Sequence, residues 1–269
     1  MQQSFVSEFR DEVFDSELPN LLAGRLDEML TSLRLVTWNC GRGTFEKKSA
    51  LLAPLRSDIT VIQECGRPRL DLKLENTLWF GEDRKHGASV QASGAYTVEA
   101  LEAREGVPQF MFPVKVTGSL SFNLLIVWAK KNKHFQEDLR YVRGVIRGVE
   151  IYRDLIERGP TVIIGDLNSN TIWDYKRPPG LNHSGLVDLL SQLGLTSAYH
   201  RFHGEAHGKE TRPTFFLQRN AKRPYHIDYC FVPDSWVGGL SSVSVGSNED
   251  WSGQSDHRPL IVDVTLPGV

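Results

Sequence analysis

Short apolar runs separated by glycine or charged residues dominate the chain after residue 32, and their length is typical of β-strands. The runs between residues 78 and 128 follow one another without a helical segment, which indicates antiparallel connections. We expect strands at 33–38, 59–63, 78–80, 88–91, 96–101, 110–116, 122–128, 161–164, 214–217, 226–232 and 259–264.

Helical periodicity appears in three segments of this region, at 45–55, 137–158 and 184–193. The longest segment carries an apolar stripe that runs from Tyr141 to Ile156, and Gly194 ends the last one. This order of strands and helices predicts one domain at 33–269, a sandwich of mixed sheets covered by helices. Residues 1–32 read as one or two further helices, which we expect to form an appendage that packs on the domain or on a partner protein.

Composition excludes several classes of protein. The 269 residues are 40% hydrophobic and 24% charged, which is ordinary for a globular protein. No apolar run is long enough for a transmembrane helix and the N-terminus has no apolar signal segment, so we expect a cytoplasmic protein without a membrane partner. Cys40, Cys65 and Cys230 form no CxxC pair and are expected to be buried thiols.

The net charge of −2 hides an uneven distribution. Residues 1–32 contain two basic and seven acidic side chains, whereas the remaining chain carries a net charge of +3. The expected domain is therefore mildly basic, and its N-terminal appendage is acidic.

Polar residues end several of the apolar runs, in the segments TWN (37–39), QE (63–64), GDLN (165–168), HIDY (226–229) and SDH (255–257). An unpaired carboxylate in a core strand is costly, so we expect these ends to share a pocket at one rim of the sheets. Carboxylates with an amide suit Mg²⁺ or Mn²⁺, and a neighbouring histidine can stabilise an oxyanion. The chain has no GxSxG or Walker sequence, so the set indicates metal-assisted hydrolysis of a phosphate ester.

The same five segments, the last extended to SDHRP (255–259), resemble the endonuclease/exonuclease/phosphatase superfamily in their order and spacing. The resemblance spans about residues 33–266. It implies an α/β fold, a four-layer α/β/β/α sandwich of two mixed, largely antiparallel sheets flanked by helices. It also implies a Mg²⁺- or Mn²⁺-dependent phosphoesterase.

The resemblance implies a metal site built on Glu64 as the main ligand, with Asn39 organising metal and phosphate and Asp256 nearby. Some members have an acidic residue two positions after the first asparagine. Gly41 stands there in this chain, which argues against a second metal. Some also have a tyrosine where Trp128 stands, and the indole cannot replace a phenolic acid although it can wall a substrate.

The resemblance also implies catalytic roles. Asp166 matches the group that activates or orients the attacking water, and Asn168 matches its positioning partner. His257 matches the histidine that contacts the scissile phosphate, and Asp228 matches the carboxylate that holds this histidine and raises its pKa.

Candidate substrate contacts lie on the helix at 137–158 and in the loop after GDLN. Arg140 and Arg143 share the helix face opposite the apolar stripe. Two interpretations fit this placement equally well: the arginines contact substrate phosphates, or they form an ordinary solvent-exposed helix face. Trp173 and Tyr175 are followed by Lys176 and Arg177, a combination of aromatics and cations suited to base stacking.

Three histidines, His200, His203 and His207, recur at helical intervals farther along the chain. Gly204 and Gly208 indicate a loop rather than a helix in this segment, so the sequence disfavours a metal cluster there.

Three classes of function fit the residues to different degrees. The favoured one is a metal-dependent nuclease that acts on DNA or RNA. A phosphatase or phosphodiesterase on an inositol phosphate, a lipid head group or a small nucleotide is the alternative. A non-catalytic module is disfavoured, because Glu64, Asp166 and His257 are all intact.

Overall fold

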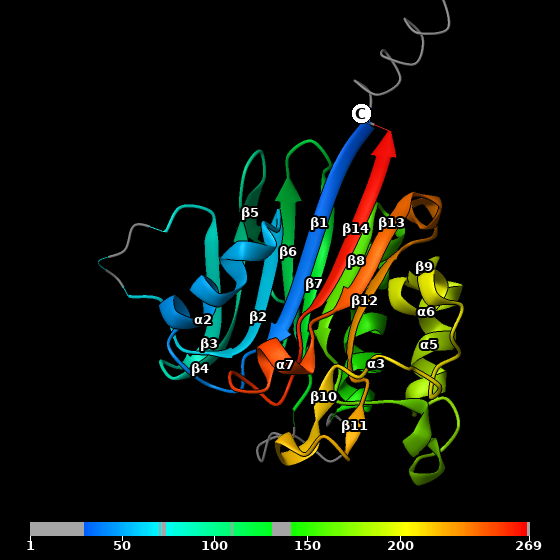
Figure 1. Cartoon of the computed structure of the whole chain (residues 1–269). Helices are drawn as coiled ribbons and strands as arrows, with labels where there is room; N and C mark the ends of the chain where they lie inside the picture. The colour runs from blue at the N-terminus through cyan, green and yellow to red at the C-terminus, as the bar shows by residue number, and fades with distance from the viewer. Residues whose placement is uncertain (1–29, 70, 72–73, 109, 131–140, 268–269) are drawn as a thin grey trace, which may run out of the picture.

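The computed structural model describes residues 30–69, 71, 74–108, 110–130 and 141–267. In these residues two six-stranded sheets lie face to face, and helices cover their outer surfaces (Figure 1). This arrangement confirms the predicted four-layer sandwich. Of the helical appendage expected at 1–32, residues 1–29 lie outside the described residues and stay a prediction, whereas Leu30–Ser32 are strand rather than helix.

The first sheet is built around the parallel pair β1–β2, with antiparallel neighbours on both sides. Its first strand begins at Leu30, earlier than expected, because Leu30 to Ser32 continue the pairing with β14 as far as Pro267. In spatial order the sheet contains β13 (Leu240–Val245), β14 (Leu260–Pro267), β1 (Leu30–Asn39), β2 (Ile59–Cys65), β4 (His86–Ala92) and β3 (Thr77–Asp83).

The second sheet also contains one parallel pair, β7–β8, and its other pairs are antiparallel. A short ribbon of β10 (Phe215–Phe216) and β11 (Pro224–Tyr225) lies outside both sheets. The spatial order is β5 (Thr97–Ala100), β6 (Met111–Thr117), β7 (Phe122–Trp128), β8 (Thr161–Asp166), β12 (Asp228–Pro233) and β9 (Leu195–Ser197).

The helices confirm most expectations and correct one. The single helix expected at 137–158 is two shorter helices. The first begins after Tyr141, which has a φ of 53°, and the break between the two lies at Tyr152, where φ is −92° and ψ is 10°. Its residues 137–140 lie outside the described part of the chain. The helices are α2 (Phe45–Leu52), α3 (Val142–Ile151), α4 (Arg153–Glu157), α5 (His183–Gln192), α6 (Ala198–His203) and α7 (Asn248–Trp251). Over the described residues, none is long and apolar enough to cross a membrane.

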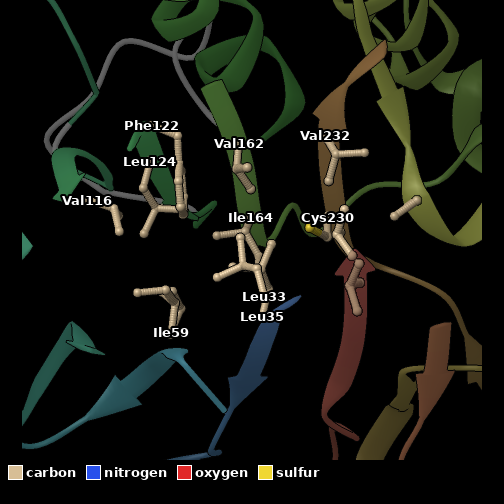
Figure 2. Packing of buried hydrophobic residues seen from close by; sticks show 14 of the residues in the cluster. Leu33, Leu35, Ile59, Val116, Phe122, Leu124, Val162, Ile164, Cys230 and Val232 are labelled. Carbon is tan, nitrogen blue, oxygen red and sulfur yellow. The ribbon is translucent and has the colours of Figure 1, made fainter. Parts of the chain in front are cut away.

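Strand alternation divides the apolar side chains among three layers. Leu33 and Leu35 of β1 point between the sheets, whereas Val36 and Trp38 pack outward with α2. Val162 and Ile164 of β8 likewise belong to the central core, which Figure 2 shows between the two sheets. The central core is therefore continuous across both sheets.

The three cysteines are buried and unpaired, as expected. Cys40 and Cys65 pack in the outer layer with α2, and Cys230 lies in the central core. Burial raises the pKa of Cys65 to about 11, so this thiol stays protonated and unreactive near neutral pH.

At one end of the sandwich the central core becomes polar. Asn39, Asp166 and Asp228 occupy positions that continue the inward alternation of Leu35, Ile164 and Cys230, respectively. Asp166 and Asp228 are also direct register partners in the β8–β12 pair. The inward-facing layer of apolar side chains therefore ends in a buried amide and two buried carboxyl groups.

Gly165 makes this end of β8 possible. Its φ is 138°, and a Cβ built on it would lie 1.9 Å from the carbonyl oxygen of Val127 and 3.0 Å from Nε2 of Gln63. Only glycine allows β7 to approach β8 this closely immediately before Asp166.

We predict that Gly165→Ala destabilises the domain by more than about 2 kcal/mol, because the new methyl group meets backbone and the φ is strained for alanine. Urea unfolding followed by circular dichroism measures this loss. Gly159→Ala is the matched control, since no atom lies within 4 Å of its built Cβ. Equal unfolding midpoints for the two variants would contradict the argument.

Candidate active site

A chain of hydrogen bonds joins three of the predicted site residues across the two sheets. The amide of Asn39, at the end of β1, donates from Nδ2 to Oδ2 of Asp166 at 2.9 Å and to Oε1 of Glu64 at 3.2 Å. Asn39 and Asp166 are buried and Glu64 is half-buried. The sequence therefore predicted correctly that these strand ends meet at one rim.

A β-bulge turns Glu64 toward this rim. The pairing of β2 with β4 slips between Gln63 and Cys65, and Glu64 has a φ of 59°. Strict alternation would place Glu64 on the outer face beside Ile62, so the bulge is what directs its carboxylate to Asn39. A non-glycine residue held at positive φ carries strain, which is common at functional sites.

The amide of Asn39 is oriented as a donor. Carboxylates accept hydrogen bonds, so Nδ2 must face Glu64 and Asp166, and Oδ1 accepts the bond from the backbone N–H of Gly41 at 3.0 Å. In this arrangement Asn39 holds the two carboxylates in place. The expected role of Asn39 in a metal site stays a prediction.

Asp166 is fully buried and accepts two further hydrogen bonds besides the one from Asn39, both of them from Asn168. The backbone N–H of Asn168 donates to Oδ1 at 2.8 Å, and Nδ2 of Asn168 donates to Oδ2 at 3.1 Å and to the carbonyl of Ala129 at 2.8 Å. Asn168 reaches this position with a φ of 47°. Burial is the largest influence on Asp166 and raises the pKa of its carboxyl, while the nearby His257 opposes that rise.

His257 and Asp228 form the second half of the rim. Nδ1 of His257 lies 2.9 Å from Oδ2 of Asp228, and both side chains are buried. Burial lowers the pKa of His257, but attraction to Asp228 and their hydrogen bond outweigh it, and the pKa is raised to about 9. The imidazole is thus positively charged near neutral pH, and Nε2 is left to donate toward a substrate.

Asp256 is half-buried beside this pair, and its backbone carbonyl accepts from Phe216 N–H at 2.8 Å. Gly41 has a φ of 60°, and a Cβ there would lie 2.9 Å from Oγ of Ser255 and 3.2 Å from Oδ1 of Asp256. The space for a second acidic side chain at position 41 is therefore already taken by the segment that contains Asp256.

Buried groups that the sequence analysis did not single out hold the rim segments together. Oγ of Ser255 donates to the carbonyl of Asn39 at 2.8 Å and accepts from His257 N–H at 3.0 Å. Thr214 accepts at Oγ1 from the N–H groups of Ile227 and Asp228, and its carbonyl accepts from Arg258 N–H at 2.7 Å. These contacts connect the segments that carry Asn39, Asp228 and His257.

Lys48 also holds these segments together, which was not expected for a lysine. Its Nζ donates to the carbonyl of Cys40 at 2.7 Å and to the carbonyl of Gln254 at 2.6 Å, and burial lowers its pKa. A signal was available in the sequence, because Lys48 lies three residues after Phe45 and four before Leu52, on the apolar face of α2.

The residues predicted to contact substrate do not all lie together in the structure. Trp173 lines a hollow of about 420 Å³ together with Asn168, Lys176, Arg177 and Phe215. The ring of Phe215 lies 4.6 Å from that of His257, so this hollow opens beside His257.

Tyr175, Trp128 and Arg143 do not line this hollow. Tyr175 is 80% exposed at the surface. Trp128 lines a separate hollow of about 460 Å³ with Trp79 and Phe80. Arg143 is half-buried on α3, and Arg140 lies outside the described residues.

The loop expected for His200, His203 and His207 is wrong for the first two, because they lie on α6, which ends before Gly204. The three histidines do not act as one set. His203 pairs its Nε2 with the carbonyl of Val243 at 3.0 Å, whereas His200 and His207 stack with ring centroids 3.5 Å apart. Burial lowers the pKa of His207 to about 3 and that of the neighbouring His183 to about 4, so both are neutral near pH 7.

Comparison with known proteins agrees with the family resemblance and with the fold. A model of the Endonuclease/Exonuclease/phosphatase family matches residues 36–257, and the chain belongs to this family of phosphoesterases. No curated protein sequence matches the chain.

Two solved structures from Neisseria resemble it over 86% of this chain and 99% of theirs. One is the 3′ phosphatase NExo bound to a product DNA hairpin, with 20% identity and a TM-score of 0.64. The other is the 3′–5′ exonuclease NExo of Neisseria meningitidis, with 19% identity and a TM-score of 0.65. At these identities the likeness shows the shared fold.

We predict that Lys48→Met destabilises the domain by about 1–3 kcal/mol, because two buried carbonyls lose their donor while the volume is nearly kept. Urea unfolding measures the effect. Lys47→Met is the control, because Lys47 is exposed on the same helix. A Lys48→Met protein as stable as Lys47→Met would show that Lys48 does not support the rim.

Proposed function

We propose that this chain is a divalent-metal-dependent nuclease that hydrolyses phosphodiester bonds in DNA or RNA. One observation carries the proposal: the carboxylates joined by Asn39 and the Asp228–His257 pair converge beside a hollow lined with Trp173, Lys176 and Arg177. The rim supplies groups for phosphate chemistry, and the hollow supplies an aromatic ring and cations for the rest of a nucleotide.

The donor set fits Mg²⁺ or Mn²⁺. Glu64 and Asp256 are half-buried carboxylates at the rim, and Asp166 is a third carboxylate tied to Glu64 through Asn39. Hard oxygen ligands of this kind favour Mg²⁺ and Mn²⁺ over softer ions. When bound, such an ion neutralises charge on a phosphate oxygen and offsets the repulsion between the buried carboxylates.

The protein groups divide the remaining work. Asp166, fixed by Asn39 and Asn168, orients the attacking water and accepts its proton. His257, held by Asp228, donates from Nε2 to a phosphate oxygen and stabilises the negative charge that develops there. This assignment keeps the buried positive charge of His257 directed at the reacting group.

The hollow beside the rim favours a nucleic-acid substrate. The ring of Trp173 lies 5.1 Å from that of Tyr225, and Lys176 and Arg177 lie on the same wall. Aromatic rings stack on bases and cations contact the backbone of single strands. The NExo complex with a DNA hairpin shows that the fold is used on DNA in that protein, which supports the same substrate class here.

We predict that Asp166→Asn and His257→Gln each lower kcat at least about 100-fold, because each removes a group that acts on the reacting atoms. The assay is a panel of plasmid, single-stranded DNA, abasic duplex, RNA and inositol phosphates with Mg²⁺ or Mn²⁺, and with EDTA. Asp188→Asn, an exposed position on α5, is the matched control.

Two results would count against the proposal. Full activity of His257→Gln on a substrate that the wild type cleaves would remove the histidine from the mechanism. Hydrolysis of inositol phosphates alone would assign a different substrate class.

We predict that Trp173→Ala raises KM for a single-stranded oligonucleotide about 5- to 150-fold, the range expected for loss of about 1–3 kcal/mol of stacking on one base. The turnover number should change less, because Trp173 contacts the ring of Tyr225, whereas Phe215 is the aromatic residue against His257. Phe202→Ala replaces an exposed aromatic on α6 and serves as the control. An unchanged KM would show that the hollow does not hold a base.

A further inference from the structure

Behind the active-site rim lies a second cluster of potential ligands that the proposed hydrolysis does not use. The nitrogen or carboxylate atoms of His200, His207 and Glu210 all lie within 4.8 Å of one another. The side chains of His200 and Glu210 are only 8% and 5% exposed. Two imidazoles and a carboxylate brought together in a protein interior form a donor set for a transition-metal ion.

We propose that His200, His207 and Glu210 bind one transition-metal ion, with Zn²⁺ as the expected species, at a site separate from the catalytic carboxylates. Imidazole nitrogens favour Zn²⁺ over Mg²⁺, whereas the oxygen-rich rim favours Mg²⁺. The two sites therefore select different ions. A fourth position at the zinc site is open to water or to a neighbouring imidazole.

Neighbouring residues form hydrogen bonds to the three proposed ligands, as the residues around a metal site do to orient its ligands. Nδ1 of His200 lies 2.7 Å from Oγ of Ser197, which can accept a hydrogen bond from Nδ1–H and leave Nε2 to face the ion. Oε1 of Glu210 accepts from Nδ2 of Asn170 at 3.0 Å and from Gly208 N–H at 2.9 Å. Nε2 of His200 lies 3.0 Å from Oε1 of Glu210, so a bound ion takes the place of this hydrogen bond.

A second observation comes from His226, which is 2% exposed and lies beside the trio with its ring centroid 5.8 Å from that of His200. Its Nδ1 lies 2.9 Å from the carbonyl of Arg212, which can only accept, so the proton sits on Nδ1. Nε2 then carries a lone pair, yet it is buried with no hydrogen-bond partner among the described residues. An unpartnered imidazole lone pair in the interior marks a place where a positive ligand is favoured.

The loop that carries His207 can close on an ion. Ligand atoms in a tetrahedral zinc site lie about 3.3 Å apart, closer than the 4.8 Å limit of the trio. The rings of His200 and His207 are stacked with an interplanar angle of 15°, so their in-plane lone pairs are nearly parallel, and ion binding has to rotate the His207 ring out of the stack. His207 lies between Gly204 and Gly208, which have φ values of 66° and 85° and permit such an adjustment. Nε2 of His183 contacts Nδ1 of His207 at 3.3 Å and supports the ring from the other side.

The proposed ion would also fix the loop that follows the catalytic Asp166. Nδ2 of Asn170 bridges Glu210 to the carbonyl of His226, and Oγ of Ser169 lies 3.2 Å from Nδ1 of His183. Ser169 and Asn170 directly follow Asn168. The ion therefore acts through positioning, and its binding is measurable without any assay of hydrolysis.

The test uses the full chain, stripped with a chelator and then titrated with Zn²⁺ or Co²⁺ in excess Mg²⁺. We expect one Zn²⁺ retained per chain after gel filtration, and visible Co²⁺ absorption bands of a four-coordinate ion. His207→Gln and Glu210→Gln should each weaken the affinity at least 100-fold. Glu64→Gln should keep the ion, because it alters only the rim, and His86→Gln is the matched histidine control on β4.

Wild-type protein that retains no Zn²⁺ would overturn the proposal, as would equal retention by wild type and His207→Gln. Loss of the ion in Glu64→Gln alone would move it to the rim and also overturn it. Zinc-dependent thermal stabilisation of the wild type that is absent in His207→Gln supports the site even where Glu210→Gln folds poorly. None of these results depends on whether the chain is a nuclease.

Discussion

The desolvation of two facing aspartates organises the functional end of this molecule. Asp166 and Asp228 are fully buried and pair in register across β8 and β12, where neither carboxylate can be solvated by bulk water. Their neighbours consequently supply donors and positive charge: the amides of Asn39 and Asn168 on one side and the imidazolium of His257 on the other. The same arrangement that makes these charges tolerable in the interior gives them fixed directions toward a substrate.

Strand ends were predictable from the sequence because the central strands are continuously apolar and stop abruptly at a polar residue. That signal placed Asn39, Glu64, Asp166 and Asp228 at one rim, and the structure brings them together. The same pattern did not predict the β-bulge at Glu64, because regular strand alternation places the Glu64 side chain on the opposite face of the sheet.

Contacts between distant segments account for what the sequence did not predict. Lys48, Thr214 and Ser255 hold backbone carbonyls or N–H groups far away in the chain, and no local pattern reports such partners. Gly204 and Gly208 led to the prediction of a loop around the three histidines, but His200 and His203 lie on α6. The chain turns at Gly204 and returns His207 to His200. The break near Tyr152 escaped detection because both helical pieces share one apolar face.

The pairing of β1 with β14 has a consequence for when the candidate site exists. The register of these two strands runs from Leu30–Pro267 to Thr37–Leu260. Asn39 ends β1 and His257 directly precedes β14, so the two halves of the rim meet only when these strands have paired. Because the two strands lie far apart in the sequence, closing the first sheet and assembling the candidate site are one and the same folding step.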